Sequence, residues 1–332
     1  MTQGTLFDSN GMINYDVYIV YFSGGKDCTA SVLRLIEMGV PKQKIELWHH
    51  HIDGMGDNFM DWPITEAYCQ AFADALGLKI YFSWKEGGFK REMLRKDSRT
   101  APTTFITPDG ELITVGGNGG KESTRRKFPQ VSADLKVRWC SAYLKIDVGA
   151  TAIRNQARFN GMKVCTISGE RGEESTARSK YERLEADRSD NRNGKTPRFV
   201  DRWRVVLDWA ENQVWDIIKR HKIRVHPCYY LGFSRCSCLF CIFGNANQFA
   251  SADLINPKGS QVIQNFERDF GITIKRGMSI GELIKMGTPY KSITKKLAAL
   301  AMSDAYDQQI IMPDSEEWLL PAGAFGESCG PV

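Results

Sequence analysis

Residues 20–30 read VYFSGGKDCTA and mark an abrupt change in the character of the chain. The residues before the glycines, DVYIVYF at 16–22, form the short apolar run that is typical of a buried strand. The residues that follow, CTASVLRLIEMGV at 28–40, place apolar side chains near helical spacing and include a glycine at the end. We therefore predict a tight turn from strand to helix at residues 23–27. Such a turn directs backbone N–H groups and a helix dipole at one point, which favours an anion.

The composition is that of an ordinary globular protein of 332 residues, with 42% hydrophobic and 25% charged residues. This length predicts either one large domain with additions or two domains. No apolar run reaches the ~18 residues of a membrane span, and the first residues lack the pattern of a secretory signal. The nine cysteines are therefore expected to be thiols or metal ligands. We expect a cytoplasmic protein with no membrane partner.

Strand-like runs alternate with helical patterns along the first two thirds of the chain. Strands are predicted at 45–51, 79–84 and 163–169, with a further extended stretch within 198–209; helices are predicted at 65–76 and 211–221. This alternation predicts an α/β fold with a Rossmann-like parallel sheet.

The predicted domains are a nucleotide-binding α/β domain at 14–225 and a cysteine-containing, helix-leaning C-terminal region at 226–332. Within the first domain, residues 97–130 are rich in Gly, Thr, Pro and charge, and we expect a long mobile loop excursion there.

Three segments follow predicted strands and would crowd one edge of such a sheet, where ligands bind. They are SGGKD at 23–27, HHHIDG at 49–54 and ISGERGEES at 167–175. Asp53 is placed to accept a hydrogen bond from a ribose hydroxyl or an adenine amino group, or it is a surface turn residue. The three histidines at 49–51 alternate faces on a strand, so we expect them to line the pocket mouth rather than share a metal ion.

The residue types in the 23–27 turn suit a polyphosphate. Gly24 and Gly25 let a phosphate approach the main chain. Ser23 offers a hydroxyl and Lys26 a positive charge, while Asp27 is suited to hold Mg²⁺ or to cap the helix. The spacing is not that of a Walker A loop.

The segment after the strand at 163–169 carries two arginines at helical spacing. Arg171 and Arg178 can face one anion, and arginine makes bidentate contacts with phosphate or sulfate. The alternative is an exposed charged helix with internal pairs such as Glu174 with Arg178.

Several of these stretches together resemble one family. SGGKD resembles the pyrophosphate loop SGGKDS of the adenine nucleotide α-hydrolase superfamily, with Cys28 in place of the second serine. HHHIDG with DNFMDWPITEAY, ISGERGEESTARS, and the stretch from LDWAENQVW to CSCLFC resemble segments of phosphoadenosine phosphosulfate (PAPS) reductase-like proteins. These segments follow the family's order, and the resemblance covers roughly residues 16–245.

The resemblance implies a site that binds ATP with Mg²⁺, with Lys26, Asp27 and Arg171 as catalytic residues. It also implies that Tyr229, Tyr230 and Arg235 close over the nucleotide. The predicted nucleotide-binding residues are Ser23, Gly24, Gly25, Lys26, Asp27, Asp53, Gly169, Arg171, Glu174, Ser175, Arg178, Tyr230 and Arg235.

The cysteines predict a metal centre. Cys238 and Cys241 form a C-x-x-C pair, a spacing at which thiolates hold one metal ion or one edge of a cluster. VRWCSAYLK, which contains Cys140, resembles the family's R-W-C-T-x-x-L-K. The predicted ligands are Cys140, Cys238 and Cys241, with a fourth from Cys236, Cys228 or His226. The resemblance implies a [4Fe–4S] cluster, and a Zn²⁺ site would use the same ligands.

The leading functional hypothesis is an ATP pyrophosphatase that adenylates an acceptor for sulfur transfer, with a sulfur-donor protein as partner. Residues 121–230 carry 24 Lys and Arg against 14 Asp and Glu. This excess favours either a solvated basic face or a nucleic-acid acceptor, as in the DNA phosphorothioation proteins that the chain resembles.

Two alternatives stay open. A thioredoxin-dependent PAPS or adenylyl sulfate reductase needs a mobile catalytic cysteine, and Cys329 alone is placed for that role. The tail GESCGPV departs from the reductases' Glu-Cys-Gly-(Leu/Ile)-His, because Ser328 separates Glu from Cys and no histidine follows Gly330. The third reading is a regulatory protein that binds a nucleotide without chemistry.

Overall fold

The computed structural model describes residues 14–325, and within them eight strands form one mixed sheet in the order β5-β4-β3-β2-β1-β6-β8-β7. The five central strands, from β3 to β8 in this order, are parallel to one another, and β4, β5 and β7 join antiparallel at the edges. The strands are β1 (Val17–Tyr21), β2 (Ile45–His51), β3 (Lys79–Lys85), β4 (Thr103–Ile106), β5 (Leu112–Val115), β6 (Lys163–Ile167), β7 (Leu184–Ala186) and β8 (Phe199–Trp203). The predicted α/β class with a Rossmann-like, mostly parallel sheet is confirmed.

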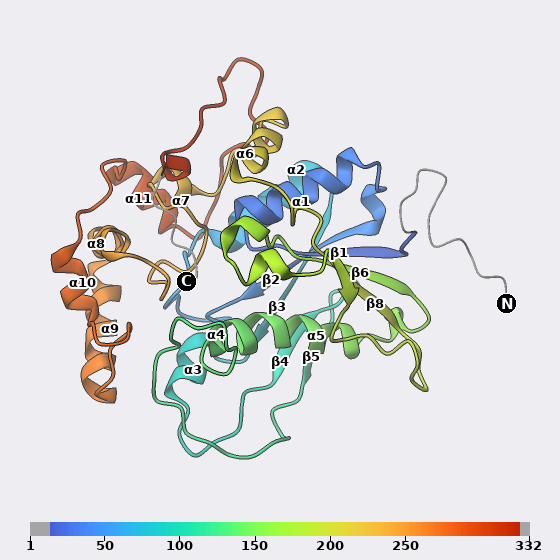
Figure 1. Ribbon diagram of the computed structural model, residues 1–332, viewed down its shortest axis with the longest axis horizontal. Helices are drawn as coiled ribbons and strands as arrows, with labels where there is room; N and C mark the ends of the chain where they lie inside the picture. The colour runs from blue at the N-terminus through green and yellow to red at the C-terminus, as the bar shows by residue number, and fades with distance from the viewer. Residues whose placement is uncertain (1–13, 326–332) are drawn as a thin grey trace.

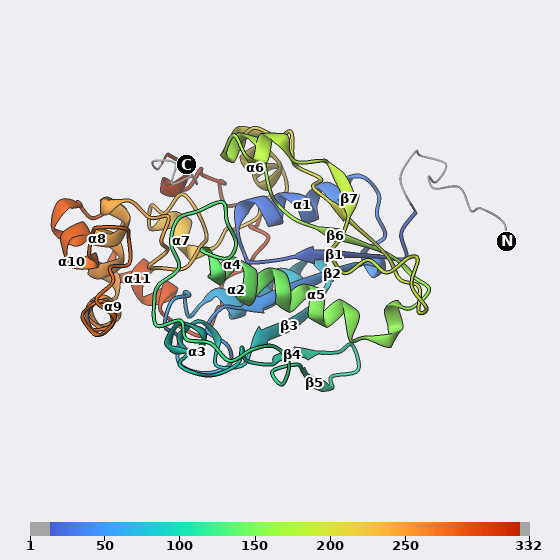
Figure 2. The ribbon, with the colours of Figure 1, turned by 60° about the horizontal axis from the view of Figure 1, so that its bottom comes forward.

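Helices cover both faces of this sheet (Figures 1 and 2). One face carries α1 (Lys26–Glu37), α2 (Thr65–Leu76) and, packed on α1, α6 (Glu211–Arg220). The other face carries α5 (Asp147–Arg154), which contacts β2, β3 and β4. The remaining α-helices of the described chain are α3 (Gly88–Leu94), α4 (Trp139–Ser141), α7 (Pro227–Tyr230), α8 (Ala246–Ile255), α9 (Pro257–Phe270), α10 (Ile280–Met286) and α11 (Lys295–Ala301).

The periodicity of the sequence accounts for these elements. The predicted strand at 45–51 and helix at 65–76 have the bounds found for β2 and α2. α2 ends at Gly77, whose left-handed backbone (φ 66°) caps the helix, as glycine does at this position. In α6, Val214, Trp215, Ile217 and Ile218 are buried, so its apolar stripe faces the core.

Residues 97–130, predicted as a loop excursion, contain the hairpin of β4 and β5, which extends the sheet beyond β3. Glu92 in α3, which is fully buried, fastens the segment. Its carboxylate accepts hydrogen bonds from Arg125 (2.9 Å), Thr100 (2.9 Å) and the backbone of Ala101 (2.9 Å). The segment therefore has regular structure where the sequence predicted none.

The larger of two hydrophobic clusters extends from Tyr15 to Trp318 and includes side chains from both predicted domains. Trp318 also donates a hydrogen bond to the carbonyl of Ile223, 2.8 Å away. The C-terminal helices α8–α11 lie together at the orange and red end of the molecule (Figure 1). Within the described residues, no helix is both long enough and apolar enough to span a membrane.

Candidate functional site

The 23–27 turn lies where the sheet reverses its strand order. From β1 the chain runs outward through β2 and β3, and it returns to the other side of β1 as β6 and then β8. In open parallel sheets, ligands bind at the carboxyl ends of the two strands that flank such a switch point. The turn follows β1, and residues 168–178 follow β6. Two of the predicted segments therefore meet.

The two segments touch through their backbones. A Cβ atom added at Gly169 would lie 2.8 Å from both the carbonyl carbon of Asp27 and the amide nitrogen of Cys28. Gly24 adopts φ 74°, which side chains other than that of glycine rarely allow. The glycines at positions 24 and 169 thus serve the turn's shape and the close approach of β6 to α1.

Asp27 and Arg171 form an ion pair at this contact, in which the arginine is buried and the carboxylate is partly exposed. Arg171 Nε donates to Asp27 Oδ1 at 2.6 Å, and the arginine is only 3% exposed. Burial raises the pKa of Asp27, but Lys26 and Arg171 lower it more, so the pKa lies below its ordinary value. Asp27 is therefore ionised, and Arg171 lies behind it and orients its carboxylate.

Lys26 is 4% exposed and held on several sides. Its Nζ donates to the carbonyl of Ser234 at 3.2 Å and lies 3.5 Å from both Asp27 Oδ2 and Glu211 Oε1. Its backbone N–H donates to the hydroxyl of Tyr229 at 2.8 Å. Residues far along the chain, at 211 and at 229–234, thus position this lysine.

A cavity of about 280 Å³ opens beside the turn, and we call it the turn cavity. Its lining residues are Tyr21, Ser23, Gly25, Asp27, Cys28, Lys145, Gly169, Glu170, Glu174, Arg178, Tyr229, Arg235, Cys236 and Ser237. The predicted nucleotide-binding residues among them are Ser23, Gly25, Asp27, Gly169, Glu174, Arg178 and Arg235. The structure brings these residues together around one cavity.

The other predicted residues do not line this cavity. Gly24 and Arg171 support the turn from behind. Lys26 lies between the lining residues Gly25 and Asp27, with Nζ 3.5 Å from Asp27 Oδ2. Tyr229, rather than Tyr230, faces the cavity, because the short helix α7 points neighbouring side chains in different directions.

Ser175 does not line the turn cavity either, and its hydroxyl accepts from the backbone N–H of Arg178 at 3.3 Å. Ser175 therefore shapes the start of the next turn of the chain.

Lys145 lines the turn cavity although it was not among the predicted residues. It belongs to a π-helical turn at Ala142–Ile146, a distortion that is frequent at functional sites. Desolvation lowers the pKa of Lys145, but Cys238, Asp61 and Cys140 raise it above the ordinary value. The signal was in the sequence, because the motif VRWCSAYLK ends at this lysine.

The charges around the turn cavity compensate one another. Glu174 pairs with Arg178 and lies 3.6 Å from Arg235. Glu170 accepts from Arg204 at 2.8 Å. The cavity is therefore a balanced polar site rather than a bare positive pocket.

Cys28 replaces the second serine of the usual loop, and its thiol faces the backbone of the turn. The thiol donates to the carbonyl of Gly25 at 3.0 Å. Burial raises the pKa of Cys28 to about 11, so it stays protonated. The S–H group that stands in place of the serine hydroxyl is thus used in a hydrogen bond within the turn.

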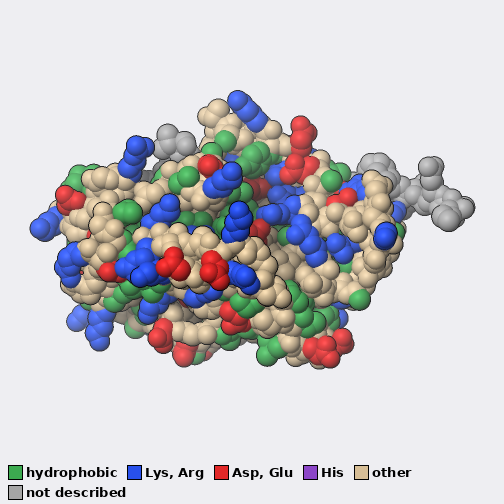
Figure 3. Space-filling view, turned by 90° about the horizontal axis from the view of Figure 1, so that it is seen from below, with side chains coloured by type: hydrophobic (Ala, Val, Ile, Leu, Met, Phe, Trp, Pro, Cys, Tyr) green, Lys and Arg blue, Asp and Glu red, His purple; other side chains and the backbone are tan. Residues whose placement is uncertain are grey.

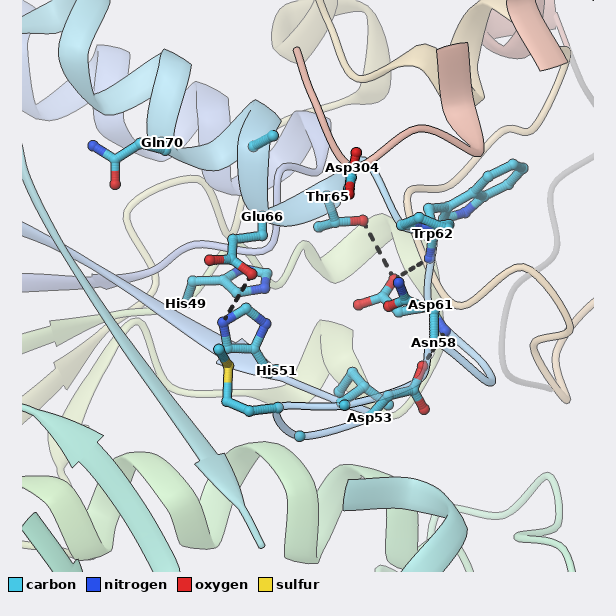
Figure 4. A pocket seen from close by; sticks show the side chains of 16 residues that line it. His49, His51, Asp53, Asn58, Asp61, Trp62, Thr65, Glu66, Gln70 and Asp304 are labelled. Atoms are coloured by element: carbon cyan, nitrogen blue, oxygen red, sulfur yellow. Dashed lines mark hydrogen bonds and ion pairs between the residues drawn. The ribbon is translucent and has the colours of Figure 1, made fainter. Parts of the chain in front are cut away.

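A second cavity, of about 370 Å³, lies between the end of β2, the loop after it and α2 (Figure 4). We call it the acidic cavity, because Asp53, Asp61, Glu66 and Asp304 line it. Asp53 was predicted to contact the nucleotide, but its Oδ2 accepts from the backbone N–H groups of Phe59 (2.9 Å), Met60 (2.8 Å) and Asp61 (2.9 Å). Asp53 shapes this loop.

The three histidines line two neighbouring cavities, and His49 borders both of them. His49 and His51 line the acidic cavity, with ring centroids 4.9 Å apart. His50 lines a smaller cavity together with His49, Lys145 and Tyr21. Burial lowers the pKa of His49 to about 4 and that of His51 to about 3, so both rings are neutral.

The predicted metal ligands separate into two groups. Among the described residues, one group of three His, Cys, Asp or Glu side chains has all its ligand atoms within 4.8 Å of one another. It consists of His226, Cys228 and Cys236. Cys140, Cys238 and Cys241 do not form such a group, yet they are neighbours. Burial and then Cys241 raise the pKa of Cys140 to about 11.

The C-x-x-C pair lies in a tight turn in which the backbone N–H of Cys241 donates to the carbonyl of Cys238 at 3.1 Å. Cys329, the cysteine of the reductase alternative, lies outside the described residues.

Comparison with known families bears on the central part of this site. Residues 119–243 match the phosphoadenosine phosphosulfate reductase domain family. The matched segment of this reductase domain contains Cys140, the loop after β6 and the C-x-x-C pair, and it begins after the 23–27 turn.

A sequence relative is an uncharacterised 37.8 kDa protein of Escherichia phage 186. It is 25% identical over 288 residues, which are 82% of this chain and 81% of the relative. Its description names no activity.

Solved structures with a weak overall likeness include two flavin-nucleotide enzymes. Yeast FAD synthetase in complex with FAD aligns with 99% of this chain and 82% of its own, at 10% identity and a TM-score of 0.38. Candida glabrata FMN adenylyltransferase with FMN and an ATP analogue aligns with 67% of this chain, at 13% identity and a TM-score of 0.35. This chain spans 54% of the length of that enzyme.

Proposed function

We propose that the protein binds Mg·ATP in the turn cavity and promotes attack on the α-phosphate, with pyrophosphate as the leaving group. The observation that carries this proposal is the meeting of the 23–27 turn with residues 168–178 around one cavity at the switch point. Backbone N–H groups at the start of α1 and a nearby lysine are the donors that phosphate oxygens require.

The side chains fit distinct tasks in this reaction. Lys26 is held rigidly, so it would stabilise charge on the departing pyrophosphate without reorganisation. Arg178 and Arg235 share Glu174, and phosphate oxygens can replace this carboxylate as their partner. Lys145, on the opposite wall, is placed to bind the α-phosphate or the acceptor.

Asp27 is the residue we propose to hold Mg²⁺. Arg171 occupies its Oδ1, while Oδ2 lies 3.5 Å from Lys26 Nζ and belongs to a carboxylate that lines the cavity. The lowered pKa keeps Asp27 ionised, as a Mg²⁺ ligand must be. The metal ion would neutralise charge on the phosphate oxygens.

Cys140, Cys238 and Cys241 are the ligands we propose for a cluster such as [4Fe–4S]. Burial first, and Cys241 in addition, raise the pKa of both Cys140 and Cys238, and the three sulfur atoms are not all within 4.8 Å of one another. A Zn²⁺ ion could use the same three thiolates. The cluster would supply a sulfur-transfer or redox function, and Lys145 would link it to the turn cavity.

A nucleic-acid acceptor finds less support. The arginines of the basic central segment are largely paired, for example Arg183 with Asp208, Arg188 with Asp147 and Arg202 with Asp187. On the face seen in Figure 3, lysine and arginine side chains are interspersed with acidic ones. A small-molecule acceptor is therefore the stronger proposal, and the likeness to phosphorothioation proteins rests on the sequence resemblance alone.

Anaerobic calorimetry of the purified protein with Mg·ATP, PAPS and adenylyl sulfate tests the proposal. We expect Mg·ATP to bind, and Lys26→Ala to weaken binding about 10- to 100-fold because one charged donor is lost. Lys42→Ala, an exposed lysine far from the turn, is the matched control and should bind as the unchanged protein does. Binding of PAPS or adenylyl sulfate in preference to Mg·ATP would overturn the proposal.

The match to the reductase domain family favours one second candidate, reduction of PAPS or adenylyl sulfate. In that reaction Cys329 would attack the sulfur atom, and Cys329→Ser would abolish turnover with thioredoxin as reductant. Under the first proposal the same substitution leaves pyrophosphate release unchanged. A nucleotide that binds yet is never consumed would instead support a regulatory role.

A further inference from the structure

His226, Cys228 and Cys236 form a compact donor group beneath the 23–27 turn. Their ligand atoms lie within 4.8 Å of one another. His226 and Cys228 are fully buried, and Cys236 is partly exposed where it lines the turn cavity. One imidazole and two thiols are a donor set that zinc prefers.

We propose that His226, Cys228 and Cys236 bind one zinc ion, at a site separate from Cys140, Cys238 and Cys241. This site goes beyond the proposed nucleotide chemistry, because none of its three ligands is needed for pyrophosphate release. The residues that the sequence assigned to one metal centre would thus form two sites. Cys140, Cys238 and Cys241 would hold a cluster, and the other group would hold a single zinc ion.

The histidine has the tautomer that such a site requires. Its Nδ1 accepts a hydrogen bond from the backbone N–H of Cys228 at 3.2 Å, so the neutral ring carries its proton on Nε2. Nε2 lies 3.4 Å from Thr65 Oγ1, a suitable acceptor. The Cys228 amide engages the lone pair of Nδ1, so a metal ion at Nδ1 would have to displace this long contact, while Thr65 holds the ring through Nε2, as residues around metal-binding histidines do.

The geometry needs a modest adjustment. A tetrahedral zinc ion separates its ligand atoms by roughly 3.3–3.8 Å, so the three atoms, which lie within 4.8 Å of one another, must approach by up to about 1.5 Å. Binding would release one proton from each thiol and would replace the long contact between Nδ1 and the Cys228 amide by a coordinate bond. Cys236 borders the turn cavity, from which water can supply the fourth ligand.

The zinc ion would fix the floor of the nucleotide site. Cys236 Sγ lies 3.6 Å from the carbonyl oxygen of Ser23, and its Cβ lies 3.6 Å from the place of a Cβ on Gly25. Tyr229, next to Cys228, accepts from the backbone N–H groups of Lys26 (2.8 Å) and Cys236 (3.2 Å). A metal bond at Cys236 would therefore stiffen the turn that we propose to hold the phosphates.

The test uses the full chain, purified anaerobically and freed of metal, then loaded with Co²⁺ or Zn²⁺. We expect one tightly bound equivalent of zinc, and with cobalt a thiolate-to-cobalt charge-transfer absorption. X-ray absorption at the zinc edge should show two sulfur and two nitrogen or oxygen ligands. Three or four sulfur ligands would assign the ion to the other cysteines and overturn the proposal.

Matched variants locate the ion. Cys228→Ser and Cys236→Ser should each abolish the charge-transfer absorption, whereas Cys238→Ser with Cys241→Ser should leave it unchanged. The reverse pattern contradicts the site, as does a Cys228–Cys236 disulfide in place of metal in protein kept under reductant.

Because Cys228 is buried, thermal unfolding of the metal-free variants checks that they fold. The number of sulfur ligands found by X-ray absorption is measured on the unchanged protein, so a folding defect in a variant does not affect it. Failure to bind Mg·ATP would contradict the proposed function and would not affect the proposal of a zinc site.

Discussion

The turn cavity and the acidic cavity lie at the same edge of one sheet, yet their carboxylates behave in opposite ways. In the turn cavity, Lys26 and Arg171 outweigh the effect of burial, and the pKa of Asp27 is lowered. In the acidic cavity, burial prevails over three backbone N–H donors, and the pKa of Asp53 is raised to about 6. The pKa of an aspartate at this edge of the sheet is thus lowered or raised according to whether a cation lies beside it.

Arg171→Gln should have the largest effect. It removes the cation that donates to Asp27 Oδ1, while Lys26 remains 3.5 Å from Oδ2 of this partly exposed carboxylate, and we expect the free energy of unfolding to fall by about 2–3 kcal/mol. Urea denaturation at pH 7 measures this loss. Arg183→Gln removes an arginine from an exposed pair with Asp208 and should cost less than about 1 kcal/mol. Equal losses would contradict the burial of Arg171 in its pair with Asp27.

The pH dependence of the same variant sharpens the contrast. Because the pKa of Asp27 is lowered in the folded protein, its stabilising contribution is present above the ordinary carboxyl pKa and is lost as pH falls through the folded value. The unchanged protein should therefore lose more stability on acidification than Arg171→Gln does. Urea midpoints between neutral and acidic pH measure this difference.

Gly169→Ala should come next. Its Cβ would lie 2.8 Å from the backbone of Asp27, so β6 and α1 must separate. We expect a loss of about 1–3 kcal/mol together with weaker Mg·ATP binding. Gly56→Ala, in the acidic cavity, meets no atom within 4 Å and should change stability by less than about 0.5 kcal/mol. Comparable losses would refute the close approach at Gly169.

Asp53→Asn should have a smaller effect, of opposite sign. The folded pKa of about 6 exceeds the ordinary value of 3.8, so the unchanged protein loses stability as pH rises between these values. The variant avoids this penalty and should gain about 1–2 kcal/mol above pH 6. Its affinity for Mg·ATP should be unchanged. Weakened binding would indicate that Asp53 contacts the nucleotide.

Glu66→Gln should have the smallest effect. Glu66 Oε2 lies 3.6 Å from His51 Nε2, but burial lowers the pKa of His51 to about 3, so no ion pair forms at neutral pH. We expect a change within about 0.5 kcal/mol in thermal unfolding at pH 7. A larger destabilisation would show that His51 is protonated in the folded protein.

The elements near the turn were predictable because their signals are local. The apolar run of β1, the glycines after it and the periodicity of α2 each lie within one short window of sequence. β4 and β5 were not predicted from the sequence, because each has only four residues and glycines follow the hairpin.

The site was predictable only in part. The choice between Tyr229 and Tyr230 depends on how α7 is oriented, and Lys145 depends on a π-helical turn that periodicity does not reveal. Which cysteines neighbour which is decided by contacts between segments that are far apart in sequence. Spacing alone therefore offered Cys228, Cys236 and His226 as alternatives for a fourth ligand beside the C-x-x-C pair, whereas these three residues form a group of their own.

The hydrogen bond from the Lys26 amide to the Tyr229 hydroxyl joins residues 203 positions apart. During synthesis, β1 and α1 leave the ribosome long before Tyr229 does, so a nascent chain contains the SGGKD residues without the hydroxyl that orients them. The chain can thus assemble much of its sheet before the nucleotide turn acquires its final form. Premature termination before residue 229 would yield a protein that carries the loop's sequence and lacks the hydroxyl that completes it.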